Sequence, residues 1–194
     1  MGLNAQTDIE THPWEPFLPA NAKVLFLGTF PPGSHRWSMN FYYPNPTNDF
    51  WRIMGLLFCG DRNALYDVGA RCFHEDVVRA FAAEHGIALG DTAKKVRRLR
   101  GNASDKFLEI VEPVNLAAIL SRIPLCHTVV ATGEKAASVL AELTGTAVPP
   151  VGGIATAADG LRIWRVPSSS RAYPLALEKK AAVYRTVLLD AGVL

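Results

Sequence analysis

The sequence predicts an α/β fold, namely a three-layer α/β/α sandwich around a mostly parallel central sheet of about four strands. Short apolar runs typical of strands buried on both faces alternate with longer segments that have helical spacing. The 194 residues, 49% hydrophobic and 20% charged, suit a soluble domain with a substantial core. Because no repeat, low-complexity tract or linker interrupts the pattern, we expect residues 1–194 to form a single domain.

The order of the elements follows from local signals. Residues 1–20 are polar and proline-punctuated, so we expect a loose lead-in before a first buried strand at 23–28. A helix is expected over 48–58, with Thr47 or Asn48 as its N-cap. Further strands are expected at 87–91, 128–132 and 161–166, with a minor strand near Ile154, and further helices at 75–84, about 105–111 (capped by Ser104-Asp105), 116–123 (capped by Asn115), 134–143 and 175–189.

Charge gives limited information about partners. The formal net charge is only +2, which does not identify a partner by itself. Residues 94–100 contain five basic side chains and no acid. Such a run is either a solvated face or a contact to phosphates, and both interpretations stay open.

Cysteine and histidine patterns argue against a metal site. Cys59, Cys72 and Cys126 are scattered without metal-ligand spacing, which favours a reducing compartment. His74-Glu75 lacks the second histidine of a zinc motif. We therefore expect no metal and no cofactor. Without a signal pattern or a membrane-spanning run, we expect a cytoplasmic protein with no membrane partner, and nothing in the sequence requires more than a monomer.

The most informative stretch is residues 24–51. A buried strand ends at Gly28 and is followed by a loop rich in proline and glycine, and then by aromatic and amide side chains up to Trp51. Open α/β sheets bind ligands at the carboxyl ends of their strands, where aromatic faces and amides would be useful. The alternative is a turn whose aromatic side chains are packed in the core.

This stretch resembles a known family. Gly28-x-x-Pro-x-x-Ser34, followed by Tyr42-Tyr-x-x-Pro-x-Asn-x-Phe-Trp51, is similar to the first motif of the uracil-DNA glycosylase superfamily, closest to its mismatch-specific and hypoxanthine-DNA glycosylase branches. Later segments resemble the hypoxanthine branch in the same order, so that the likeness extends over about 23–189. They are residues 86–91 with Arg98 and 101–105, residues 128–133 with Lys135-Ala136, and residues 166–170 with Glu178-Lys179-Lys180.

The resemblance implies a monofunctional DNA N-glycosylase of base-excision repair. Such an enzyme flips a deaminated base, uracil or hypoxanthine, out of damaged or mismatched DNA and hydrolyses its N-glycosidic bond. By motif position, Asn48 would be catalytic, holding the water or bonding the base, and Tyr43 would stack on the base. The remaining expected pocket residues are Gly28, Thr29, Phe30, Pro31, Asp91 and Thr132. Ser168 would hold a DNA phosphate, and Ser169, Ser170 and Arg171 would enter the minor groove.

The sequence departs from the superfamily at two important positions. Phe30 stands where most branches have Asp or Asn, and Val166 stands where many have His or Asn. The hypoxanthine-type branch lacks both as well. Thr132 replaces the Asn that relatives often use to read the base, so the base preference stays open. Two alternatives follow: a catalytically impaired glycosylase-fold protein that only binds DNA, and a hydrolase of small nucleosides.

Each candidate residue also has a purely structural interpretation. Asn48 is a good helix N-cap, and Tyr43 and Phe30 are suited to core packing. Asp91 could serve only in capping or an ion pair, and residues 168–170 only in a turn. His35 is a loop histidine whose contact with DNA is equally open.

Overall fold

The computed structural model describes residues 8–99 and 105–194. Its main sheet has five strands in the order β3-β2-β6-β8-β7. They are β2 (Val24–Gly28), β3 (Ile87–Asp91), β6 (Thr128–Thr132), β7 (Ile154–Thr156) and β8 (Arg162–Val166). Strands β3, β2, β6 and β8 run parallel, and only β7 is antiparallel to its neighbour β8. The predicted mostly parallel sheet is confirmed, including the minor strand near Ile154.

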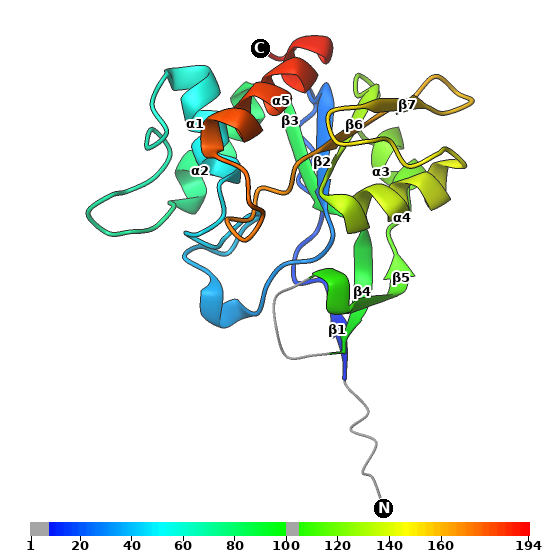
Figure 1. Cartoon of the computed structure of the whole chain (residues 1–194), viewed down its shortest axis with the longest axis horizontal. Helices are drawn as coiled ribbons and strands as arrows, with labels where there is room; N and C mark the ends of the chain where they lie inside the picture. The colour runs from blue at the N-terminus through cyan, green and yellow to red at the C-terminus, as the bar shows by residue number, and fades with distance from the viewer. Residues whose placement is uncertain (1–7, 100–104) are drawn as a thin grey trace, which may run out of the picture.

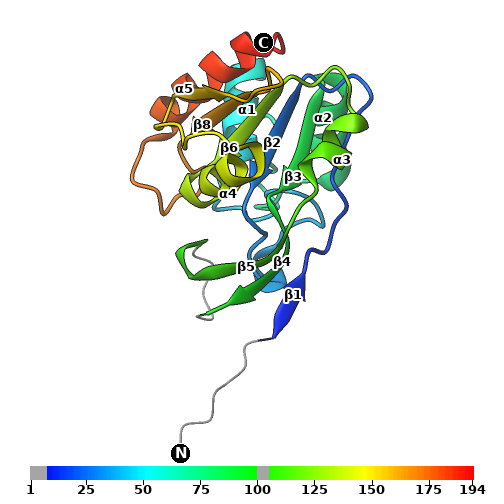
Figure 2. The same cartoon turned by 90° about the vertical axis from the view of Figure 1, so that its right-hand side faces the viewer.

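Helices cover both faces of this sheet (Figures 1 and 2). On one face lie α1 (Phe50–Cys59), α2 (Glu75–Glu84) and α5 (Leu177–Asp190), and on the other lie α3 (Leu116–Ser121) and α4 (Glu134–Thr144). Alternate residues of β2 point to opposite layers: Val24 and Phe26 into the first core, and Leu25 and Leu27 into the second. Every residue of β2, β3 and β6 is buried for this reason. The three-layer prediction is confirmed.

The ends of the helices follow local chemistry. The side chain of Asn115 accepts a hydrogen bond from the Ala118 N–H at 3.0 Å, so its predicted role as the N-cap of α3 is confirmed. Helix α1 begins at Phe50, two residues later than expected, with Asp49 at the N-cap position. Helix α4 follows Gly133, whose φ of 123° is open to glycine but not to most other residues.

A second, smaller sheet corrects two predictions. It consists of β1 (Ile9–Thr11), β4 (Ala93–Arg98) and β5 (Leu108–Pro113), all antiparallel in the order β1-β4-β5. The helix expected over 105–111 is wrong, because a single 3-10 turn (η2, Asp105–Phe107) leads directly into β5. The loose lead-in is also wrong for the described residues 8–20, which contribute β1 and a bridge from Phe17 to Leu89. Residues 1–7, and residues 100–104 with the expected cap Ser104 and most of the resembling segment 101–105, lie outside the described ranges.

The basic run forms one strand of this small sheet. Lys94 and Lys95 both contact Glu112 of β5, at 3.3 and 2.7 Å. Arg97 pairs with Glu109, and Arg98 donates to Glu10 of β1. These basic side chains are therefore engaged within the small sheet, mostly in exposed pairs that contribute little to stability. Arg100 is not among the described residues.

This arrangement defines one functional edge. The strands β2, β3, β6 and β8 end at Gly28, Asp91, Thr132 and Val166, all on the same edge of the parallel sheet. The small sheet lies beyond that edge (Figures 1 and 2). A short 3-10 turn, η1 (Ser34–Arg36), follows β2 there. No helix within the described ranges is long and apolar enough to cross a membrane.

Candidate active site

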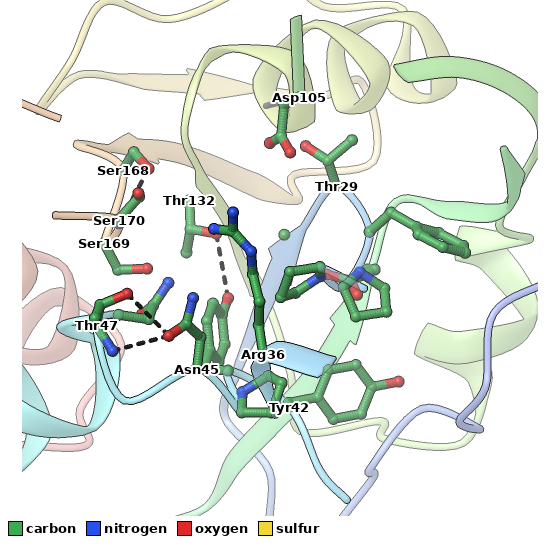
Figure 3. A pocket seen from close by; sticks show the side chains of 18 of the residues that line it. Thr29, Arg36, Tyr42, Asn45, Thr47, Asp105, Thr132, Ser168, Ser169 and Ser170 are labelled. Carbon is green, nitrogen blue, oxygen red and sulfur yellow. Dashed lines mark hydrogen bonds between the residues drawn. The ribbon is translucent and has the colours of Figure 1, made fainter. Parts of the chain in front are cut away.

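A cavity of about 240 Å³ opens at the carboxyl ends of β2, β3 and β6 (Figure 3). The residues that line it come from several distant segments of the chain. Every residue that the sequence predicted for the pocket, for catalysis or for DNA contact is among them: Gly28, Thr29, Phe30, Pro31, Tyr43, Asn48, Asp91, Thr132, Ser168, Ser169, Ser170 and Arg171. Their shared location fits a ligand site, whereas the role of each one remains a prediction.

The inner part of the cavity lies where three strands end. A Cβ atom on Gly28 would overlap Asp91 Oδ1, so glycine is required there for the carboxyl group to approach the end of β2. Thr132 Oγ1 donates to Leu27 O at 3.3 Å and also contacts the Tyr43 hydroxyl at 3.2 Å. Figure 3 shows Thr132 in this position, between the serine loop and the aromatic side chains. A carboxyl group and two hydroxyl groups are thus available to a ligand.

Tyr43 forms an aromatic wall of the cavity. Its ring is stacked on Phe50, with centroids 3.9 Å apart and planes inclined by only 8°. The ring is therefore fixed, with one face against the core and the other available to the cavity it lines. Tyr43 has a φ of 54°, which is uncommon for a residue other than glycine and is often retained at functional sites. Burial raises the pKa of its hydroxyl well above the ordinary value, so the group stays neutral.

Asn48 both helps to cap helix α1 and lines the cavity. Asn48 precedes the N-cap Asp49, so the expected N-cap role is wrong, but its Oδ1 accepts a hydrogen bond from the N–H of Phe50, the first helical residue, at 2.9 Å. The side-chain NH₂ group makes no hydrogen bond to another residue within the described ranges. One end of the amide therefore serves the helix, while the other is free to donate to a ligand.

His12 is a site residue that sequence reasoning missed. Its Nε2 lies 2.8 Å from Asp91 Oδ2, and both side chains are less than a tenth exposed. Its Nδ1 lies 2.8 Å from Trp14 O, which fixes the ring. Burial raises the pKa of Asp91, while its hydrogen bond with His12 acts in the opposite direction. The two residues are 79 positions apart, so no local pattern could reveal the pair.

Phe30 and Asp105 complete this side of the cavity. Phe30 lines the cavity and also packs with Ala93, Val96 and Leu108, so it is both a pocket wall and part of a small core. Its ring meets the edge of His12 at 5.3 Å. Asp105 points toward the Thr29 hydroxyl group (Figure 3), and burial raises its pKa. Asp105 is thus a second carboxyl group of the cavity beside Asp91, and sequence reasoning did not assign it to the pocket.

A buried ion pair joins the serine loop, residues 167–171, to the turn that contains Asn48. Lys180 of α5 is fully buried, and its Nζ donates to Asp49 Oδ2 at 3.2 Å and to Ser170 O at 2.8 Å. Arg171 donates to the other carboxylate oxygen, Oδ1, at 3.0 Å. The Asp49 N–H donates to Ser169 O, and Asn48 forms a β-bridge with Ser170. We name this set of contacts the Asp49–Lys180 clasp.

The clasp sets the orientation of the serine loop. Ser168 and Ser170 are half-buried and line the cavity, whereas Ser169 is only 3% exposed and is turned toward the protein. Of the groups predicted for the minor groove, Ser170 and Arg171 are thus the more accessible. Val166 is fully buried in the core, and His35 is exposed on η1 but does not line the cavity. Its neighbour Arg36, which the sequence did not single out, does line it.

A wider groove of about 1010 Å³ continues from the cavity and shares Arg36, Asp105, Ser168 and Ser170 with it. Lys106, Lys135 and Tyr173 also line this groove. Cations and hydroxyl groups along a groove beside a deeper cavity are suited to a chain of phosphates.

The remaining titratable clusters offer no metal centre within residues 8–99 and 105–194, since no three His, Cys, Asp or Glu side chains gather there. Cys59, Cys72 and Cys126 are free thiols.

Comparison with known proteins gives a single type of relationship. No family model matches the chain, and no curated protein matches it. Among solved structures, the chain is similar to the solution NMR structure of a candidate uracil DNA glycosylase from Methanosarcina acetivorans. The superposition has a TM-score of 0.65 and covers 93% of this chain and 99% of that one, with 22% sequence identity. The two proteins share a fold.

Proposed function

We propose that this protein is a monofunctional DNA glycosylase that hydrolyses the N-glycosidic bond of a flipped, deaminated base, uracil or hypoxanthine, in DNA. The observation that carries the proposal is that residues from all four segments that resemble glycosylase motifs line one cavity. The fold shared with the Methanosarcina acetivorans structure supports it. We further propose that the protein acts in the cytoplasm as a monomer, without metal or cofactor.

The cavity has the properties that such a reaction needs. Flipping a nucleotide costs a few kcal/mol, and stacking on an aromatic face recovers about 1–3 kcal/mol per base. The Tyr43 ring, held against Phe50, would provide that face. Negative charge develops on the departing base, so donors directed at it stabilise the transition state. The free NH₂ group of Asn48 would be such a donor.

The positions of the lysines support hydrolysis without strand scission. A bifunctional glycosylase needs an amine nucleophile in its pocket, and no lysine lines the cavity within the described ranges. Lys106 and Lys135 line the adjacent groove, where we propose that they, with Arg36 and Ser168, contact DNA phosphates. Lys180 is fully buried and bound to Asp49 and Ser170.

The direct test uses labelled oligonucleotides, single- and double-stranded, that contain uracil, hypoxanthine, xanthine or a mismatched thymine. We expect one or more of these substrates to be cleaved only after alkali treatment, because a monofunctional enzyme leaves an intact abasic strand. Asn48→Ala should reduce that cleavage by about 10²–10³-fold. Asp67→Asn, which changes an exposed Asp–His pair outside the cavity, should leave it unchanged.

Two observations favour a second candidate, a DNA-binding protein of glycosylase fold without activity. Phe30 and Val166 are apolar where many relatives have acid, amide or imidazole groups. Absence of cleavage on every substrate, together with salt-sensitive DNA binding, would support this candidate. A hydrolase of small nucleosides would instead show turnover of free nucleosides that hardly depends on salt.

A further inference from the structure

We propose that Asp91 is the catalytic base of this reaction and that His12 is the residue that positions it. This inference rests on the proposed function and names the group that activates water. Neither the sequence motif nor the fold assigns that task to Asp91, because the motif position that commonly carries an acid is occupied by Phe30.

Few groups of the cavity can accept a proton from water. The Asn48 side chain is a neutral amide without useful basicity, and the buried Tyr43 hydroxyl stays protonated. Asp49 does not line the cavity and is engaged by Lys180 and Arg171. Within the described ranges, Asp91 and Asp105 are therefore the carboxyl groups that could act as the base.

The surroundings favour Asp91 over Asp105. Asp91 lies at the end of β3, directly beside Gly28 and Thr132 and on the same inner part of the cavity as Tyr43. His12 contacts Oδ2, while the Gly28 backbone also donates a hydrogen bond to the carboxyl group, whose Oδ1 lies at the end of β2. A carboxylate oxygen has two lone pairs, so one that accepts a single hydrogen bond can still take a proton from water. Asp105 instead faces Thr29 and borders the wider groove.

The packing of His12 explains why the carboxyl group has a fixed position. The Trp14 backbone holds Nδ1, while the ring of Phe30 meets the imidazole edge at 5.3 Å and that of Tyr42 is stacked at 5.8 Å. The Trp14 N–H donates to Nδ1 at 3.1 Å, and in that tautomer Nε2 carries the hydrogen, which it donates to Asp91 Oδ2. In a nearly dry site this donor stabilises the ionised carboxylate against the cost of burial. Phe30 thus supports a base that comes from another strand.

The proposed step is balanced in atoms and electrons. Water oxygen forms a bond to the anomeric carbon of the flipped nucleotide, and Asp91 takes one proton of that water. The electron pair of the glycosidic C–N bond leaves with the base, which is protonated from solvent. Asp91 returns its proton to solvent when the products leave. The products are the free base and an abasic sugar.

The charged and titratable groups that face Asp91 are His12, Tyr42, Tyr43 and Asp105. The pKa values of both tyrosines are raised, so their hydroxyl groups stay neutral over the pH range of the proposed rate profile. Asp91 must be ionised to act as the base. Turnover should therefore fall as the pH decreases through the pKa of Asp91 in the folded protein, which burial raises above the ordinary value.

Single-turnover rates on the substrate identified above test the assignment. Asp91→Asn should reduce the rate by about 10²–10⁴-fold, the usual contribution of a general base, while the affinity for abasic-site DNA stays within about threefold of wild type. Asp67→Asn is the matched control, because Asp67 also accepts from a histidine, His74, but lies in the open. Full activity of Asp91→Asn, or a large loss in Asp105→Asn without one in Asp91→Asn, would overturn the proposal.

His12 is tested by its effect on the pH profile. His12→Leu removes the donor to Asp91, so the acid limb of the rate profile should move to higher pH, with turnover recovering toward wild type in alkaline buffer. His12→Gln retains an N–H donor, so its acid limb should lie between those of the wild type and His12→Leu. Asp91→Asn should not recover turnover at any pH. A uniform loss in His12→Leu without a shifted limb would show a purely structural role. Inactive wild-type protein would instead contradict the proposed function itself.

Discussion

At the scale of single residues, Asn48 combines two tasks that substitution can separate. Its oxygen caps the first turn of α1, and its NH₂ group is directed to no other described residue. Asn48→Asp keeps the cap acceptor but removes the donor, whereas Asn48→Ala removes both.

We expect Asn48→Asp to keep the thermal stability of the wild type yet to lose about 10²–10³-fold in turnover, the usual effect of removing one positioned donor. Asn48→Ala should lose a similar factor and also about 0.5–2 kcal/mol of stability. Thermal melts and single-turnover kinetics measure the two effects separately. Wild-type turnover in Asn48→Asp would leave Asn48 with the capping role only.

Substitution of Asp91, unlike that of Asn48 by alanine, is expected to maintain or increase the stability of the fold. Because burial raises its pKa in the folded protein, the folded state holds the proton more tightly than the unfolded chain, and ionisation of Asp91 reduces stability as the pH rises. Asp91→Asn should therefore melt at or above the wild-type temperature at pH 8, and the difference should shrink toward pH 4. A clearly lower melting temperature at pH 8 would show that the ionised carboxylate stabilises the fold.

The residues of the cavity were predictable to the extent that they follow strands in the sequence. Gly28, Asp91 and Thr132 end buried apolar runs, which local pattern identifies well. His12 and Lys180 were missed as site residues, because their partners Asp91 and Asp49 lie 79 and 131 positions away. Glu178-Lys179-Lys180 resembles the glycosylase segment in the sequence, but only the structure gives Lys180 a physical role, as the buried partner of Asp49.

At the scale of elements, the Asp49–Lys180 clasp connects three segments: the turn before α1, the serine loop and α5. A fully buried lysine is stable only because its partners compensate for the loss of water. The clasp therefore determines how the serine loop meets the cavity.

We expect Lys180→Met to cost about 3–5 kcal/mol, because it leaves Asp49 buried with Arg171 as its remaining charged partner. DNA affinity should fall as well, since the serine loop loses the bond to Ser170 O. Lys179→Met, an exposed neighbour on the same helix, should change stability by less than about 0.5 kcal/mol. Equal melting temperatures for both variants would contradict the role of the clasp.

The small sheet shows where prediction from local sequence fails. Residues 105–111 contain a good helix cap followed by Lys, Phe, Leu and Glu, but Glu109 and Glu112 find their cationic partners on β4. Cross-strand pairs of this kind stabilise a strand over a helix, and they cannot be predicted from one segment alone. Elements of the main sheet were predictable because burial on both faces imposes continuous apolar runs.

At the scale of the whole molecule, a net charge of +2 hides an uneven distribution. Four basic residues of the small sheet are engaged by acids, whereas Arg36, Lys106 and Lys135 line the groove beside the cavity. The basic side chains of the groove, rather than the net charge of the protein, therefore predict where DNA would bind.

The salt dependence of binding to an abasic-site duplex tests whether the groove contacts DNA phosphates. The logarithm of the binding constant should fall linearly with the logarithm of salt concentration, and Lys135→Ala should reduce the slope by about one. Lys23→Ala, at the opposite edge of the sheet just before β2, should leave the slope unchanged. A slope that Lys135→Ala does not alter would place the DNA elsewhere.

The most direct test of the central claim is mass spectrometry of the products formed from uracil- and hypoxanthine-containing duplexes, without alkali. We predict release of the free base from an otherwise intact strand by the wild type, and release about 10²–10⁴-fold slower by Asp91→Asn. A wild-type protein that binds these duplexes but releases no base, or that cuts the strand without alkali, would contradict the account of a monofunctional glycosylase.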